Sequence, residues 1–217
     1  MRCAWTPCDD SAGAWHRFLP MLRANHYARH YNEQIGTTEP YRGTDHTVAT
    51  MVHLAKGAVD PRAMVQSALQ GERSIRLRRH AEQIVNNIRP KDYSSELIAI
   101  GKWWGNAGRY TRDPLHIEML RTPDRLLDDA LAGNLACDCD EFALAIAVSC
   151  MTIGARANFV TVGFKPRLPG QPKVHTHVFC RAQDPRTKIW WVLDPVAGRK
   201  TANMLKRVKQ YTIFEVD

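Results

Sequence analysis

Hydrophobic residues in the second half of the chain change their spacing once, close to residue 155. Before that point they recur every three or four positions, which is the spacing of one helix face. After it they fall in short runs rich in β-branched and aromatic residues, which favour strands. The pattern predicts an α+β fold, with a helical front half followed by an antiparallel meander.

The helices are predicted from their periodicity together with start and stop signals. Asp60-Pro61 and Thr122-Pro123 each combine a polar N-cap with a proline at the first helical position. We expect Pro90, Gly133 and Gly154 to end helices. The predicted helices are Pro61–Gln70, Ile75–Ile88, a segment capped by Ser94 or Ser95 that contains Trp104, Thr122–Leu131, and a strong helix that starts after Asp138.

The first 60 residues carry a weaker pattern. Helical pieces are predicted over Ser11–Asn25 and Thr47–Lys56, separated by the polar stretch Gly36–Asp45. We therefore divide the chain into a helical N-terminal region, residues 1–92, and a second domain, residues 93–217. The first region is expected to act as a docking arm.

Four strands are predicted after the strong helix, and two of them form a hairpin around Asp184-Pro185-Arg186-Thr187. The strands are Asn158–Phe164, Val174–Arg181, Lys188–Asp194 and Tyr211–Val216. If the turn centres between Pro185 and Arg186, His177 lies opposite Asp194, with Cβ atoms about 4.5–5.5 Å apart. A carboxylate at that distance can orient an imidazole. His175 would instead face Val196, and a slip of one residue would break the pairing.

Cys139 is the candidate nucleophile because it stands at the start of the strong helix. Unpaired N–H groups and the positive end of the helix dipole stabilise a thiolate there. The adjacent Asp138, Asp140 and Glu141 oppose this effect. The Cys139 backbone N–H could also hold an oxyanion, and three side chains are candidates for a second donor. These are Trp104, Asn106 and Asn134.

Two alternative interpretations of the cysteines remain open. Cysteines in a core usually behave as small hydrophobic residues, which is the expectation for Cys150 and Cys180. Cys137 and Cys139 could bind zinc together with His175, His177 and Cys180, although these spacings are not those of standard zinc sites. We therefore predict neither a metal nor a cofactor. Oxidation of Cys137 with Cys139 or Cys180 would block the nucleophile.

Composition and charge narrow the setting. The chain has 217 residues, a net charge of +8 and six cysteines, and 44% of its residues are hydrophobic. It has neither an apolar run of about 18–20 residues, as a membrane span needs, nor the apolar core of a secretory signal near Met1. We expect synthesis in the cytoplasm. The densest basic cluster, Arg73–His80, is expected to be a solvated helix face, which disfavours nucleic acid as a partner.

Several of these motifs, taken in order, resemble the transglutaminase-like superfamily of papain-related cysteine hydrolases. Cys139-Asp140-Glu141-Phe142-Ala143 is similar to its nucleophile region, and His177-Val178-Phe179 to its histidine strand. Trp190–Pro195 is similar to the strand that ends in Asp-Pro, and Tyr110…Asp113 to the lead-in. The resemblance covers residues 95–196. It implies a papain-like fold, with the cysteine helix packed on an antiparallel sheet, and a Cys139–His177–Asp194 triad.

Members of that superfamily include peptidases, amidases, acyl transferases and proteins that have lost activity. The resemblance therefore implies a hydrolase of amide bonds, acting on protein or on peptidoglycan peptides. The same region more loosely resembles proteins encoded in tailed-phage and prophage genomes. An alternative is a catalytically idle component of a phage tail or virion, which would contact other virion proteins through residues 1–92.

Overall fold

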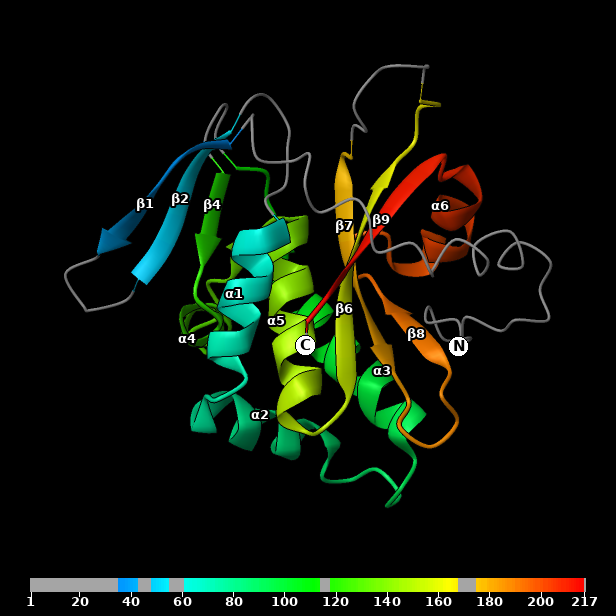
Figure 1. The fold of residues 1–217 in the computed structure, drawn as a ribbon. Coiled ribbons are helices and arrows are strands. Elements are labelled where there is room, and N and C mark those ends of the chain that lie inside the picture. Colours follow the sequence, from blue (N-terminus) through cyan, green and yellow to red (C-terminus); the bar gives the residue numbers. More distant parts are fainter. Residues whose placement is uncertain (1–34, 43–47, 55–60, 114–117, 168–174, 217) are drawn as a thin grey trace.

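The computed structural model describes residues 35–42, 48–54, 61–113, 118–167 and 175–216, and these form a mixed α+β fold. A central helix, α5 (Cys139–Thr152), packs against a four-stranded antiparallel sheet (Figure 1). The strand order is β8-β7-β6-β9, with β6 at Arg156–Gly163, β7 at His177–Gln183, β8 at Trp190–Leu193 and β9 at Gln210–Glu215. The change of hydrophobic spacing near residue 155 coincides with the turn from α5 into β6, where Gly154 has φ +90°.

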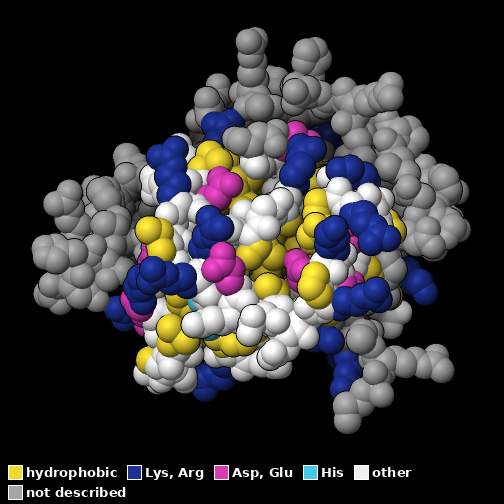
Figure 2. All heavy atoms as spheres, turned by 90° about the horizontal axis from the view of Figure 1, so that it is seen from below, with side chains coloured by type: hydrophobic (Ala, Val, Ile, Leu, Met, Phe, Trp, Pro, Cys, Tyr) yellow, Lys and Arg dark blue, Asp and Glu magenta, His cyan; other side chains and the backbone are white. Residues whose placement is uncertain are grey.

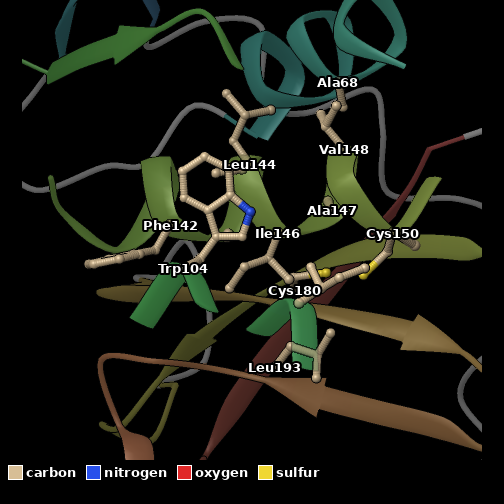
Figure 3. Packing of buried hydrophobic residues seen from close by; sticks show 14 of the residues in the cluster. Ala68, Trp104, Phe142, Leu144, Ile146, Ala147, Val148, Cys150, Cys180 and Leu193 are labelled. Atoms are coloured by element: carbon tan, nitrogen blue, oxygen red, sulfur yellow. The ribbon is translucent and has the colours of Figure 1, made fainter. Parts of the chain in front are cut away.

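Helix α5 occupies the centre because it is buried on all sides. Every residue from Asp140 to Met151 is buried, as expected of a helix whose surface is apolar nearly all round. Figure 3 shows Ile146 and Cys150 of α5 against Cys180 of β7 and Leu193 of β8. The other face of the sheet carries a second core around Phe179 and Val192, covered by α6 (Thr201–Arg207), which follows a 3-10 turn at Gly198–Lys200.

Four helices surround α5 on the side away from the sheet or along its flanks. They are α1 (Pro61–Gly71), α2 (Ile75–Val85), α3 (Tyr93–Ala107) and α4 (Pro123–Leu131). Met64 of α1 and Leu77 of α2 belong to the same core cluster as the residues of α5. The first two helices, which the sequence assigned to the N-terminal region, thus pack on the central helix.

The helix starts show where local signals were sufficient. Thr122 caps α4 as predicted, and α5 starts after Asp138 as predicted, with Asp138 as its N-cap. The prediction for α3 was wrong by two or three residues, because the N-cap is Asp92, whose Oδ1 accepts a hydrogen bond from the Ser95 backbone N–H at 3.3 Å. An Asp accepts this bond as well as a Ser does. Helix α2 also ends at Val85, well before Pro90.

A second, three-stranded sheet lies beside α1 and α4 (Figure 1). Its strands are β1 (Ile35–Arg42), β2 (Val48–Leu54) and β4 (Glu118–Arg121). The helix predicted over Thr47–Lys56 was therefore wrong: β2 pairs antiparallel with β1 on one side and β4 on the other, which overrides local preference. The predicted helix at Ser11–Asn25 and the predicted cap Asp60 lie outside the described residues.

The basic cluster on α2 is a solvated surface, as predicted. Arg73, Arg76, Arg78 and Arg79 are all exposed. Arg76 pairs with Asp128 of α4, and Arg78 pairs with Glu82 at 2.9 Å. Figure 2, which views the molecule from the α2 end, shows Lys and Arg side chains dispersed among Asp and Glu. None of the helices in the described ranges is long and apolar enough to cross a bilayer.

Candidate active site

His177 and Asp194 form a buried hydrogen-bonded pair. His177 begins β7 and Asp194 follows the last residue of β8. The His177 Nε2 atom lies 2.8 Å from Asp194 Oδ2, and the two residues are 9% and 1% exposed. Asp194 Oδ1 accepts a second hydrogen bond, from the backbone N–H of Ala197 at 3.0 Å. The carboxylate is thus fixed in place, and because it occupies Nε2, Nδ1 is the ring nitrogen left for another partner.

The hairpin register that led to this pair differs from the prediction by two residues. Cys180 pairs with Leu193, so continuing the ladder by one step sets Asp194 beside Phe179 and not opposite His177. A two-residue shift keeps every side chain on its predicted face. Asp194 and His177 therefore become diagonal neighbours, which a long side chain can bridge.

Cys139 lies at the same end of the α5–sheet layer as His177. Helix α5 turns tightly into β6, and β6 pairs antiparallel with β7. Helix α5 and strand β7 therefore run in the same direction, and Cys139 and His177 are their first residues. Cys139 is half-buried, and the N-cap Asp138 accepts hydrogen bonds from the backbone N–H groups of Asp140 and Glu141.

The segment Gly105–Tyr110 connects the two halves of the site. A Cβ atom at Gly105 would lie 3.0 Å from Pro195 Cβ, the residue after Asp194. A Cβ atom at Gly108 would lie 2.8 Å from the ring of Phe142, one turn into α5. Burial, followed by the charge of the nearby Cys139, raises the pKa of Tyr110. A segment of six residues thus lies against both the Asp194 end of β8 and the Cys139 end of α5, which limits the separation of these ends.

The three candidate oxyanion donors lie in different surroundings. Trp104 was a wrong candidate, because it is fully buried and its Nε1–H donates to Ser149 Oγ at 2.9 Å. Its indole fills the space between α3 and α5 (Figure 3). Asn106 is exposed and lies within the connecting segment Gly105–Tyr110, and Asn134 is exposed just before β5 (Ala136–Cys137). Both remain predictions.

The acidic residues around Cys139 carry less charge than their number suggests. Both Glu141 carboxylate oxygens accept hydrogen bonds from the Arg121 guanidinium, at 2.7 and 2.8 Å. Burial, followed by a hydrogen bond and Coulomb repulsion from Asp140, raises the pKa of Asp138 to about 10. The Asp138 carboxyl is therefore neutral at pH 7. Two of the three acids that oppose a thiolate are paired or protonated.

The other cysteines of the described ranges are poor nucleophiles. Cys137, Cys150 and Cys180 are buried free thiols, whereas Cys139 is half-buried. Burial raises the pKa of each of the three buried thiols. The sulfur atoms of Cys150 and Cys180 lie near each other between α5 and β7 (Figure 3). No group of three metal-ligating side chains gathers among the residues that the structure describes. Cys3 and Cys8 lie outside them.

Two polar networks that support the site were missed in the sequence. Arg121 at the end of β4 ties Glu141, Asp129 and the carbonyl of Ala136 together, with distances of 2.5–2.8 Å. Ser94 donates to Asp184 at 2.6 Å and accepts from Trp191 Nε1 at 3.0 Å, which ties α3 to the β7–β8 hairpin. Both networks join residues far apart in the sequence, so no local sequence motif predicts them.

No protein-family model and no curated protein sequence matches this chain.

Proposed function

We propose that the chain is a cysteine-dependent hydrolase of amide bonds with a transglutaminase-like, papain-related core, in which Cys139, His177 and Asp194 act as a triad. The observation that carries the proposal is the 2.8 Å bond from His177 Nε2 to the buried Asp194 carboxylate, at the end of the layer where α5 presents a half-buried thiol. Such a carboxylate fixes the tautomer of an imidazole and stabilises its protonated form.

The thiol and the ring would meet at the edge of β7. Alternation sets His177 on the side of Phe179, while Val178 and Cys180 face α5. Strand β8 pairs with β7 only from Cys180 to Gln183, so in the described part of the chain no strand covers this edge beside His177. In this proposal the Cys139 thiol approaches Nδ1 around the open edge.

The reaction would proceed in two steps. His177 Nδ1 takes the thiol proton, and the thiolate attacks the amide carbonyl. The tetrahedral oxyanion is held by the Cys139 backbone N–H, and Asn106 and Asn134 are the remaining candidates for a side-chain donor. The C–N bond then breaks as His177 returns the proton to the amine. Water, deprotonated by His177, hydrolyses the thioester and releases the acid and the free thiol.

Alkylation of the folded protein tests this proposal. Iodoacetamide at neutral pH should label Cys139 much faster than Cys3 or Cys8, with adducts mapped by peptide mass spectrometry. His177→Ala should abolish the difference, while a matched change of His80 to Ala should preserve it. If Cys139 reacts no faster than the N-terminal thiols, the triad is idle, and the alternative of a structural component that retains the fold gains support.

A further inference from the structure

The acidic and basic residues around Cys139 differ in their burial. The three flanking acids are all buried: Asp138, Asp140 and Glu141. The neighbouring segment carries two exposed cations, Arg109 and Arg112. Asp138 is neutral at pH 7 and Glu141 is paired with Arg121. The exposed charges of Arg109 and Arg112 are therefore positive, although the residues that flank Cys139 are acidic.

Backbone pairing holds these cations beside the thiol. Strand β3 (Arg109–Tyr110) runs parallel to β5, which ends two residues before Cys139. The Arg109 N–H donates to the Leu135 carbonyl at 2.8 Å, and the Thr111 N–H donates to the Cys137 carbonyl at 2.9 Å. These two bonds fix the chain on both sides of Tyr110. The position of Arg112 is therefore set by the same element that leads into the nucleophile helix.

Tyr110 and Arg112 form a pair that faces solvent. Tyr110 is 44% exposed and Arg112 is exposed too. Burial, followed by the Cys139 charge, raises the pKa of Tyr110, while the nearby Arg112 side chain lowers it. The adjacent carboxylate, Asp113, is engaged elsewhere, since it accepts a hydrogen bond from the Met119 backbone N–H at 2.5 Å. No described carboxylate forms an ion pair with Arg112. A guanidinium in this setting can bind a carboxylate through two parallel hydrogen bonds.

We propose that Arg112, held beside the nucleophile helix by the pairing of β3 with β5, is a specificity-determining residue that selects substrates bearing a carboxylate next to the scissile amide. This inference rests on the proposed function, because it assigns the substrate class of the same site. It adds a preference that the triad alone does not supply: acyl donors with an acidic neighbour should react faster than neutral ones of the same size.

Two alkylating reagents of matched size test the preference. Iodoacetate and iodoacetamide both form a bond from the thiolate sulfur to the same methylene carbon and release iodide, but only iodoacetate carries a carboxylate. The ratio of their rate constants at Cys139 cancels any change in thiolate content. The full-length protein is compared with Arg112→Gln, Arg112→Lys and the control Arg186→Gln, an exposed arginine at the distant hairpin turn.

Arg112→Gln should lower the iodoacetate-to-iodoacetamide ratio about threefold to tenfold. Arg112→Lys should restore part of the ratio, because Lys keeps the charge but not the planar fork. Arg186→Gln should leave it unchanged. If Cys139 labels rapidly but the ratio is the same in Arg112→Gln, the preference is refuted and the proposed hydrolase stands. If Cys139 is slow with both reagents, the proposed function fails, and the inference fails with it.

Discussion

His177 and Asp194 are hydrogen-bonded at 2.8 Å although they are not cross-strand partners. The ladder of β7 and β8 ends at the pair Cys180–Leu193, and one further step would set Asp194 beside Phe179, so the carboxylate reaches back along the strand to the imidazole. The backbone N–H of Ala197 holds the other carboxylate oxygen. The loop after β8 thus orients Asp194 toward His177.

Replacing Asp194 by Asn should separate orientation from charge. Asn keeps the size and the acceptor for Ala197, but it no longer stabilises a protonated imidazole. We expect the rate of Cys139 alkylation by iodoacetamide at neutral pH to fall about tenfold or more, with little change in melting temperature. Asp194→Ala should lose both rate and stability. An unchanged rate in Asp194→Asn would show that the pair is only structural.

Arg121 and Glu141 provide a stability test remote from the proposed chemistry. The Arg121 side chain is 13% exposed and lies among two carboxylates and a carbonyl, and its hydrogen bonds with Glu141 raise its pKa. Arg121→Met leaves Glu141 uncompensated, and we expect the free energy of unfolding to fall by about 3–5 kcal/mol. The double variant Arg121→Met/Glu141→Leu should recover a large part of this loss, as measured by urea unfolding.

The exposed pair Arg78–Glu82 is the matched control for that experiment, with side chains 65% and 52% exposed. Arg78→Met should change the free energy of unfolding by less than about 0.5 kcal/mol. If Arg121→Met and Arg78→Met lose similar amounts of unfolding free energy, the Arg121 network stabilises the fold no more than an exposed ion pair does. An unchanged free energy of unfolding in Arg121→Met would show that the Arg121 network does not stabilise the fold.

Local capping signals predicted much of the helical half of the fold. Thr122-Pro123 starts α4, and Asp138 and Gly154 bracket α5, because each acts through its own backbone neighbours. The same logic failed for residues 47–56, where pairing with two other strands decides the conformation. Propensity is a weak guide when partners lie far away in the sequence.

Only part of the candidate site could be predicted from the sequence, for the same reason. The His177–Asp194 contact was predicted, yet through a register that the structure does not have. A two-residue shift leaves the pattern of buried and exposed faces unchanged, so hydrophobic alternation alone does not distinguish the two registers. The link from Arg121 to Glu141 spans 20 positions, and nothing in the spacing of the two residues foretells it.

Ser94 should matter for the hairpin that carries Asp194. Its hydroxyl bridges Asp184 Oδ2 and the indole of Trp191, so Ser94→Ala removes the hydrogen bond of each of these atoms, while Asp184 Oδ1 keeps its bonds to the Arg186 and Thr187 N–H groups. We expect a loss of about 1–3 kcal/mol in the free energy of unfolding. Ser95→Ala, which removes only an exposed bond to Asp92, is the control. Equal effects of the two substitutions would exclude a special role for the Ser94 bridge.

The protein should lose stability as pH rises, because Asp138 is held protonated in the folded state. Burial and the neighbouring Asp140 raise the pKa of Asp138 to about 10, whereas an unfolded Asp titrates near pH 4. Between these values the folded state binds one proton more, so stability is highest at the acidic end and falls by up to about 1.4 kcal/mol per pH unit toward pH 10.

Asp138→Asn should flatten this dependence, since an amide keeps an acceptor for the backbone N–H groups that Asp138 caps, without titrating. Urea unfolding at pH 6, 7.5 and 9 would measure the slope in both proteins, with the exposed Asp128→Asn on α4 as control. The slope of the Asp128 variant should match that of the unmodified protein. If Asp138→Asn shows the same slope as the unmodified protein, Asp138 is ionised in the folded state, and the negative charge beside Cys139 is larger than the geometry implies.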